Sequence, residues 1–284
     1  MAQDAARVLV LLGAGVSYGA SRARSNFDSP NDSYQDFEPF PSWEGLMRIM
    51  LHRLKMLPDM KGREDNLESF FTRESPLDCA ELARGVLGAE TFNNVLRQAY
   101  GGPSHMFTST SHEALVRLPL KEIFTTNYDT LIEDAFLGQE LAVSAGPAQF
   151  IARMPQRPKR HLVKLHGTID DLNTIVLTRS DYAKARKSRV EMFEHLRTSL
   201  MQSSFLFVGY SLTDPNFNLI HDEVRLVMGA NMPPSYLVQG ERDAVREAYL
   251  RQLGVNVISL GNWIYLPQLL TAINPDVALE DNLR

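Results

Sequence analysis

Short polar or glycine-rich runs directly follow four apolar segments of this sequence, and they hold the residue types best suited to chemistry. These runs are Gly13–Ser17, Thr125–Asp129, Leu165–Thr168 and Gly209–Asp214. Each apolar segment predicts a buried strand, so each run would lie in a βα turn. In open α/β sheets these turns share the carboxyl edge, where ligands bind. We therefore expect one ligand site built from four turns.

The turn after the predicted strand Glu122–Thr125 carries an amide and a carboxylate, Asn127 and Asp129. Apolar residues at helical spacing follow it and predict a helix over about Asp129–Phe136. The two polar residues have two interpretations. They line the ligand pocket, or they only cap the helix through a side-chain oxygen, which by position alone is the commoner role.

His166 alone among the seven histidines falls directly after a predicted strand, Leu162–Leu165. Histidine is the usual general base near neutral pH, although a single histidine is more often structural. Gly167 follows it and would let backbone or ligand approach closely. His166 is therefore a candidate base.

Gly13-Ala14-Gly15-Val16-Ser17 directly follows the apolar run Arg7–Leu12. A strand that enters such a turn and then a helix is typical of dinucleotide-binding starts, where backbone N–H groups face a pyrophosphate. The match to G-x-G-x-x-G is imperfect, because the third glycine would fall at Tyr18 and Gly19 comes one place late.

Alternating strands and helices indicate an α/β fold with a doubly wound, mostly parallel, Rossmann-like sheet. Strands are predicted at Arg7–Leu12, Glu122–Thr125, Leu162–Leu165, Thr174–Leu177, Ser204–Val208, Ser235–Val238 and Asn256–Leu260. After the helix at Asp129, further helices are predicted at about Ser180–Lys187, Val190–Gln202, Pro215–Val227 and Arg242–Leu253. Asp214 and Pro215 suit the N-cap and first position of a helix.

A helical insertion is expected between the first two strands of the sheet. Residues 21–42 are rich in Ser, Asn, Asp and Pro and predict a long loop that could act as a lid. Helices are then predicted from Ser42 to about Met56 and at about Leu67–Phe71, Ser75–Leu87, Thr91–Tyr100 and Ser109–Leu118, with no strand-like run between them. We expect residues 1–20 and 118–284 to form the Rossmann-like domain and residues 21–117 the insertion, with a flexible cofactor loop.

Composition restricts the class of protein. The chain has 284 residues, a formal net charge of −5 and 44% hydrophobic residues, and no apolar run approaches the ~18 residues that span a bilayer. The first residues lack a signal-peptide pattern. Cys79 is the single cysteine, which excludes an internal disulfide and a multi-cysteine zinc site. We expect a cytoplasmic protein with no metal and no membrane partner, and the negative charge disfavours direct nucleic-acid binding.

The four runs, in this order, resemble the sirtuin fold over about residues 7–262. The chain lacks the four-cysteine zinc module of sirtuin deacylases and their Asp-Phe-Arg element. Instead Pro39–Glu44 resembles the Pro-x-x-Trp entry of the sirtuin-like NADase domains of bacterial antiphage defence systems. The resemblance therefore implies NAD+ as the substrate and hydrolysis to nicotinamide and ADP-ribose, with depletion of cellular NAD+ as the antiphage effect.

The resemblance also implies roles for individual residues. Asn127 and His166 would be catalytic, and the expected contacts to NAD+ come from Gly13, Ala14, Gly15, Ser17, Thr125, Asp129, Gly209 and Ser211. Asp129 could balance charge or only fix the turn. Thr126 stands where sirtuins have a glutamine, so no role is assigned to it.

Two other functions stay open at this point. One is protein deacylation or ADP-ribosylation in the same pocket, and the other is a module that senses NAD+ or ADP-ribose without turnover. An unregulated NADase would kill its host, so a trigger is expected. The resemblance suggests a homo-oligomer or a separate phage-sensing partner, such as a short Argonaute or a HerA-type ATPase.

Overall fold

The computed structural model describes residues 8–17, 19–23, 37–101 and 106–274. Its centre is a seven-stranded sheet whose strands are all parallel, in the order β10-β9-β8-β1-β5-β7-β6. The strands are β1 (Val8–Leu12), β5 (Glu122–Thr125), β6 (Ala142–Ser144), β7 (His161–Lys164), β8 (Ser204–Val208), β9 (Ser235–Gln239) and β10 (Val255–Ser259). The predicted doubly wound, mostly parallel, Rossmann-like fold is confirmed.

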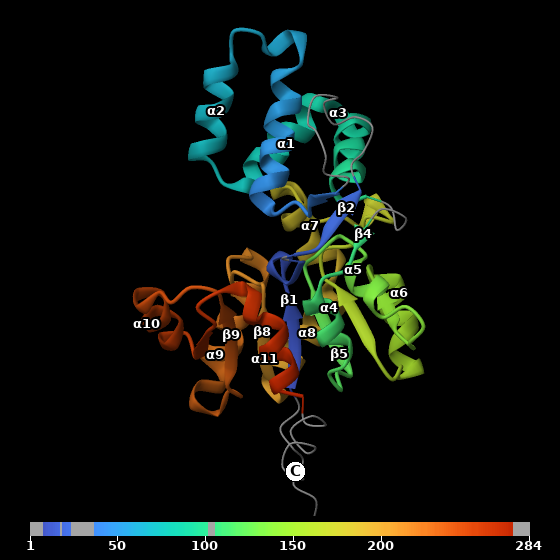
Figure 1. The fold of residues 1–284 in the computed structure, drawn as a ribbon, viewed down its shortest axis with the longest axis vertical. Helices are drawn as coiled ribbons and strands as arrows, with labels where there is room; N and C mark the ends of the chain where they lie inside the picture. The colour runs from blue at the N-terminus through green and yellow to red at the C-terminus, as the bar shows by residue number, and fades with distance from the viewer. Residues whose placement is uncertain (1–7, 18, 24–36, 102–105, 275–284) are drawn as a thin grey trace, which may run out of the picture.

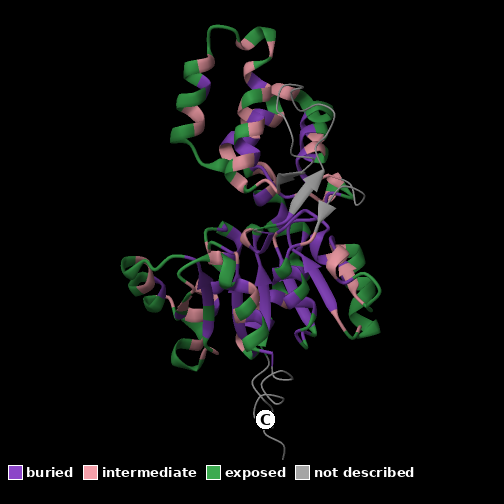
Figure 2. Cartoon of the chain, viewed as in Figure 1, coloured by how far each residue is buried: buried purple, intermediate pink, exposed green. Residues whose placement is uncertain are grey.

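Helices cover both faces of this sheet (Figure 1). One face carries α6 (Pro147–Arg153), α7 (Arg179–Ser188), α8 (Val190–Gln202), α9 (Pro215–Met228) and α10 (Ala244–Gln252), and the other carries α4 (Thr110–Val116), α5 (Leu131–Ala135) and α11 (Leu266–Ala272). Side chains alternate along β1, so that Leu9 and Leu11 enter the first core and Val10 and Leu12 the second. Figure 2 shows the strands buried between the two helical layers.

A helical insertion lies beyond the carboxyl edge of the sheet, at the top of Figure 1. Its helices are α1 (Trp43–Lys55), α2 (Glu64–Arg73) and α3 (Pro76–Tyr100), and α3 is kinked at Gly88, where φ is +75°. The two helices predicted on either side of this glycine are therefore the two arms of α3. The core of the insertion continues into Tyr128, Ile169 and Leu177, which belong to loops of the sheet domain.

The expectation that no strand interrupts the insertion is wrong. A small antiparallel sheet in the order β3-β2-β4 joins β2 (Ser21–Ala23), β3 (Phe37–Pro39) and β4 (Met106–Phe107). These strands are two or three residues long, too short for a hydrophobic period to show. Most of the expected lid, residues 24–36, lies outside the described residues.

The predicted strand at Thr174–Leu177 is also wrong. The segment is apolar and buried at Val176 and Leu177, but its hydrogen bonds go to turns and not to a ladder. Val176 N donates to His166 O over 2.9 Å, and the Tyr128 hydroxyl donates to Val176 O over 2.9 Å. The seventh strand of the sheet is β6, which lies between β5 and β7 in the sequence. Neither β6 nor the helix after it, α6, was predicted.

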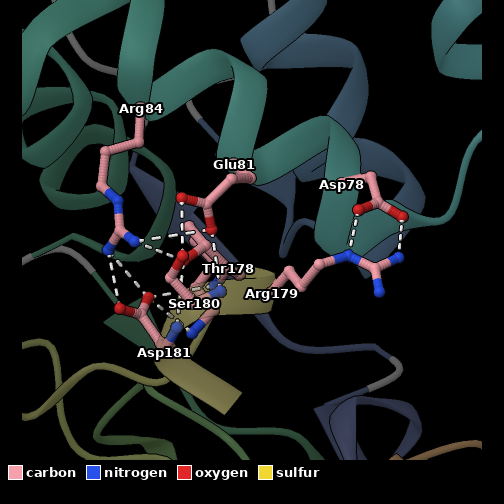
Figure 3. A network of polar contacts seen from close by, with 8 residues as sticks. Asp78, Glu81, Arg84, Thr178, Arg179, Ser180 and Asp181 are labelled. Atoms are coloured by element: carbon pink, nitrogen blue, oxygen red, sulfur yellow. Dashed lines mark hydrogen bonds and ion pairs between the residues drawn. The ribbon is translucent and has the colours of Figure 1, made fainter. Parts of the chain in front are cut away.

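Two polar contacts anchor α3 of the insertion on the N-terminal turn of α7 (Figure 3). The Arg84 guanidinium donates to both carboxylate oxygens of Asp181, over 2.7 and 2.9 Å. Glu81 accepts from the backbone N–H and the hydroxyl of Ser180, over 2.8 and 2.9 Å. Such charge-assisted contacts are stronger than neutral hydrogen bonds. They hold the insertion over the carboxyl edge of the sheet.

Short 3₁₀ turns complete the described secondary structure. They are η1 (Ala14–Ser17), η2 (Pro58–Met60), η4 (Met154–Gln156), η5 (Leu172–Thr174), η6 (Gly229–Asn231) and η7 (Trp263–Tyr265). None of the helices in the described ranges is long and apolar enough to cross a membrane.

Candidate active site

The site forms where the strand order reverses, between β1 and β8. From β1 the chain adds β5, then the edge strand β6, then β7 between those two, and it returns to the other side of β1 through β8, β9 and β10. The turns after β1 and β8 therefore lead to opposite halves of the sheet. In open α/β sheets such a switch point opens a crevice at the carboxyl edge, and ligands bind there.

Backbone contacts between these two turns explain the glycines at positions 13 and 15. Gly13 N donates to Val208 O over 3.0 Å, and Gly15 N donates to Gly209 O over 2.9 Å. A Cβ atom on Gly13 would lie 2.5 Å from Gly209 O, and one on Gly15 would lie 2.7 Å from Gly209 Cα. No side chain fits at that distance. The two turns are thus packed backbone to backbone.

This packing changes what the glycine-rich turn offers a ligand. The N–H groups of Gly13 and Gly15 donate to Val208 at the end of β8 and to Gly209 just after it, so neither is left to face a pyrophosphate. Ala14 is exposed, and the half-buried Gly15 lines a hollow at this edge of the sheet. Ser17 is buried, and its hydroxyl has no hydrogen-bond partner among the described residues. A buried unpaired hydroxyl costs about 1–3 kcal/mol, so a polar ligand atom would stabilise it.

The turn after β5 is tied to the turn after β1. The Thr125 hydroxyl donates to Leu12 O over 3.0 Å and accepts from Asn127 N over 3.1 Å. The Asn127 side-chain amide donates to Gly13 O over 3.4 Å. This last bond is long, and a ligand that offers a better acceptor would displace it. Thr125 and Asn127 are both buried between the two turns.

Asp129 contacts the start of α5 from one residue before the N-cap, which is Thr130 and makes no side-chain capping bond. Asp129 Oδ1 accepts from Leu131 N over 3.1 Å at the start of α5. Burial raises the pKa of this carboxyl to about 6, although the nearby charge of Lys164 opposes the shift. Lys164 is itself fully buried, and its Nζ lies 2.6 Å from Glu133 Oε1 and 2.5 Å from Asp129 O.

His166 and Asp214 form a buried pair at the carboxyl edge. His166 Nε2 lies 2.9 Å from Asp214 Oδ2, and the side chains are 4% and 6% exposed. Asp214 Oδ1 accepts from Phe217 N over 2.9 Å and so caps α9, as its sequence context predicts. The Tyr182 hydroxyl, from α7, donates to Asp214 Oδ2 over 3.3 Å and lies 3.5 Å from His166 Nδ1.

Asp214 stays ionised despite its burial. Desolvation by itself would raise its pKa, but the charge and the hydrogen bond of His166 act against it. The bonds from Phe217 N and Tyr182 add to this effect, and the pKa lies below its ordinary value. A negative charge is therefore fixed beside the imidazole.

Gly167 and Arg189 hold the turn that carries His166. Gly167 has φ +85°, and a Cβ there would lie 2.0 Å from Thr174 O, so it is a close backbone approach that requires glycine. The buried Arg189 donates to Leu165 O over 3.0 Å and also to Thr174 O. Burial lowers the pKa of this guanidinium to about 10, and the group stays charged at neutral pH.

A cavity of about 370 Å³ opens beside His166 and Asp214. The sheet domain lines it with Thr126, Tyr182, Tyr210 and Ser211 as well as the pair. The insertion closes it with Trp43 from α1 and with Ser75–Leu77 at the start of α3. The helical insertion is therefore one wall of the site.

Two further hollows continue from Tyr210 and Ser211 toward β9. One, of about 200 Å³, contains Gly15, Gly209 and Arg246 in its wall, and the next, of about 490 Å³, shares Arg246 and Trp263 with it. Arg246 donates to Ser211 O over 2.8 Å. Leu212, next in the turn, has φ +56°, a strained conformation for a leucine. Tyr210 and Ser211 of the β8–α9 turn thus line both the His166 cavity and the hollow on the β9 side.

The structure brings all four predicted turns together at one edge, but it distributes their residues unevenly. His166 and Ser211 line the cavity beside the His166–Asp214 pair, Gly15, Gly209 and Ser211 line the hollow toward β9, and Asn127, Thr125 and Asp129 lie buried beneath the turns. Sequence reasoning missed Asp214 as a site residue because its role as a helix cap already explained it. It also missed Tyr182, for which no sequence pattern points to the pocket. Within the described ranges, His, Cys, Asp and Glu form no cluster of three or more that suits a metal.

Comparison with known proteins agrees with this geometry. Residues 121–258 match the SIR2-like domain family. Over 161 residues, 55% of this chain and 32% of the relative, the sequence is 34% identical to the NAD(+) hydrolase ThsA of Enterococcus faecium. It is 26% identical to the protein of the same name from Cytobacillus dafuensis, over 67% of this chain and 36% of the relative. Defense-associated sirtuin 2 of Bacillus subtilis is 20% identical over 68% of this chain and 20% of that protein. The chain thus spans about a third or less of these relatives' lengths.

Proposed function

Because this chain carries a SIR2-like domain related to ThsA NAD(+) hydrolases and to a defense-associated sirtuin, we propose that it is an NAD+ glycohydrolase. It would cleave the N-glycosidic bond of NAD+ to give nicotinamide and ADP-ribose. The observation that carries the proposal is the buried His166–Asp214 pair beside a cavity at the switch point of a doubly wound sheet. A base held in a cavity at this edge is what hydrolysis needs and what simple binding does not.

The shape of the crevice suits an elongated dinucleotide. The cavity of about 370 Å³ at His166 and the hollows toward β9 meet at Tyr210 and Ser211. We place the nicotinamide-ribose half in the first and the adenosine half in the second. The pyrophosphate would then pass Ala14, Gly15 and Gly209. Ser17 would contact the adenosine half of the ligand. Ser211 stands between the two halves.

The reaction needs few groups. The bond from ribose C1′ to nicotinamide breaks and its electron pair leaves with neutral nicotinamide, so no strong acid is required. The transition state is oxocarbenium-like, as in other glycosidic cleavages. Water adds to C1′ and gives its proton to His166, a role that contributes about 10²- to 10⁴-fold in rate. The Asn127 amide, released from Gly13 O, would position the water or the ribose hydroxyls. Asp129 would either balance charge or only fix the turn.

The names of the relatives, an NAD(+) hydrolase and a defense-associated sirtuin, support a role in defence through hydrolysis of NAD+. We further propose that this defence acts against phage and depletes NAD+ in the cytoplasm. A free NADase would be toxic, so we expect activity to depend on assembly. The trigger is self-association or a separate phage-sensing partner, with a short Argonaute or a HerA-type ATPase as examples. Neither the reaction nor the expected trigger calls for a metal.

Nicotinamide release from NAD+ tests the proposal. The purified chain is incubated with NAD+ at a series of protein concentrations, with each size fraction defined by light scattering, and products are separated by chromatography. We expect release without any acylated peptide, and its loss in His166→Ala and in Asn127→Ala. Tight NAD+ binding with no release in every assembly state would instead identify a sensor. Release that requires an acylated peptide would identify a deacylase.

A further inference from the structure

The Asp214 carboxylate contacts two groups at once, and both of its oxygens have fixed positions. Oδ1 accepts from Phe217 N over 2.9 Å, which ties the carboxylate to the first turn of α9. Oδ2 lies 2.9 Å from His166 Nε2. A helix terminus thus sets where the carboxylate stands, and the carboxylate sets the orientation of the imidazole.

We propose that Asp214 is a positioning residue for His166, which holds the ring in the tautomer whose Nδ1 accepts the proton from the attacking water. The step in which that proton is accepted rests on the proposed NAD+ hydrolysis. The orientation and the tautomer of His166 belong to this chain by itself and can be measured without substrate.

The tautomer follows from the hydrogen-bond inventory. An ionised carboxylate only accepts, so His166 Nε2 must carry a proton to contact Asp214 at 2.9 Å. In the neutral ring the lone pair is then on Nδ1. The Tyr182 hydroxyl lies 3.5 Å from Nδ1 and is oriented to donate to Asp214 Oδ2. A contact of 3.5 Å is too long to occupy Nδ1 firmly.

The groups around the His166–Asp214 pair show which residue places a charge beside the imidazole. His166 faces Asp214 from the β8–α9 turn and Tyr182 from α7. Asp214 also interacts electrostatically with Tyr210 on its own turn and with Tyr128 on the β5 turn. Burial raises the pKa of each of these tyrosines above its ordinary value, so all three stay neutral. Among the described residues that face His166, Asp214 therefore supplies the charge.

The chemical step then balances. The oxygen of water bonds to ribose C1′ as the C1′–N bond breaks, and the electron pair leaves with nicotinamide. One O–H bond of the water breaks, and its proton moves to His166 Nδ1. Asp214 stays ionised and stabilises the imidazolium, as a buried carboxylate does beside a catalytic histidine.

Asp214→Asn separates the charge from the cap. Asparagine is a good N-cap, so its oxygen can still accept from Phe217 N, while its NH₂ group would face His166 Nε2. Asp222→Asn is the matched control, because it makes the same change on α9 in an exposed i,i+3 pair with Arg225. Tyr182→Phe removes the hydroxyl and keeps the ring.

We expect Asp214→Asn to lower kcat at least about 10²-fold with KM for NAD+ within about threefold of wild type. Asp222→Asn should match wild type, and Tyr182→Phe should lose less than Asp214→Asn. An unchanged kcat in a folded Asp214→Asn variant overturns the proposal.

NMR of ¹⁵N-histidine-labelled protein gives the readout that does not need turnover. The His166 signal is assigned by its loss in His166→Gln, and its two ring ¹⁵N shifts report which nitrogen carries the proton. We expect the Nε2–H tautomer in wild type and a smaller share of it in Asp214→Asn. If wild type shows this behaviour but releases no nicotinamide in any assembly state, the proposed function fails and the positioning role stands. If His166 shows the same balance of tautomers in both proteins, or carries its proton on Nδ1 in wild type, the positioning role is wrong whatever the activity.

Discussion

The backbone N–H of Gly15 donates to the carbonyl oxygen of Gly209 over 2.9 Å, and this bond joins the turn after β1 to the turn after β8. The two residues are 194 positions apart, yet a Cβ on either would overlap backbone of the other turn. The glycines of the first turn are thus required by the protein's own packing. Any contact that this turn makes with a pyrophosphate comes in addition to that structural role.

Gly209→Ala should destabilise the protein. Its Cβ would lie 2.1 Å from Val16 N, and its φ of +62° is unfavourable for alanine. We expect a loss of about 2–4 kcal/mol in the free energy of unfolding, measured in urea. Gly254→Ala is the control, because Gly254 has φ +80° but no atom within 4 Å of the added Cβ, and it should lose only about 1 kcal/mol. Equal losses in the two variants would show that packing of the turns is unimportant.

Asp129→Asn should stabilise the protein at neutral pH. The folded pKa is about 6 against an ordinary 3.8, so between pH 4 and 6 the native state holds a proton that the unfolded state has lost. Stability contributed by this group therefore falls as pH rises through that window, by up to about 3 kcal/mol. Asparagine keeps the cap to Leu131 N.

Urea unfolding at pH 7.5 and at pH 4 measures this effect. The gain of Asp129→Asn over wild type should be present at pH 7.5 and largely absent at pH 4. A variant that is less stable than wild type at pH 7.5 would contradict the prediction. Nicotinamide release in the same variant separates the two roles of Asp129, since a residue that only caps α5 leaves turnover unchanged and one that balances charge does not.

Arg84→Ala should loosen the insertion from the sheet domain. Arg84 binds both oxygens of the half-buried Asp181 and also the Thr178 hydroxyl, at the N-terminus of α7. Loss of hydrogen bonds to a charged group costs about 1.5–3 kcal/mol. We expect faster amide hydrogen exchange in the first arm of α3 and a lower kcat, because Ser75–Leu77 and Tyr182 line the His166 cavity.

Arg179→Ala is the control in the same network (Figure 3). The Arg179 side chain is 67% exposed, and its pair with Asp78 is the kind of surface contact that contributes little. Hydrogen exchange in α3 should stay close to wild type. If both variants exchange alike, the buried contacts of Arg84 do not hold the insertion in place.

Lys164→Met should be strongly destabilising, and Glu133→Gln should rescue it. Lys164 is fully buried in β7 and contacts Glu133 at 2.6 Å, so its loss leaves a partly buried carboxylate without a counter-charge. Breaking such a pair costs about 3–5 kcal/mol, whereas replacing both charges is often close to neutral. Urea unfolding of the two single variants and the double variant measures the coupling. A double variant no more stable than Lys164→Met would show that the pair is not the cause.

The fold class was predictable because it depends on local pattern. Continuous apolar runs such as Arg7–Leu12 and Ser204–Val208 predict strands buried on both faces, and the structure places β1 and β8 side by side at the sheet centre. Local pattern does not reveal a strand that is very short, and it predicts a false strand where an apolar run forms its hydrogen bonds with turns. β6 has three residues, and Thr174–Leu177 is an apolar run whose backbone bonds to His166 and Tyr128 and not to a strand.

The candidate site shows the same division. His166 was found because it follows a strand, and strand ends share one edge of a parallel sheet. Asp214 was read as a helix cap, which is correct for Oδ1, but nothing local could reveal that Oδ2 meets His166. Because Oδ1 of Asp214 already satisfies the helix-capping pattern, the sequence gives no sign of the contact that Oδ2 makes.

By itself, then, the sequence determined most of the strands and helices and the four turns, and it singled out His166 among seven histidines as a candidate base, because periodicity and turn chemistry act over a few residues. Only the tertiary structure decided which atoms meet. It directs the N–H groups of Gly13 and Gly15 to the carbonyl oxygens of Val208 and Gly209, it places Asp214 against His166 across 48 residues, and it brings the insertion's Trp43 to the same cavity. Those contacts depend on strand order and helix packing, and both are set by burial of the whole core.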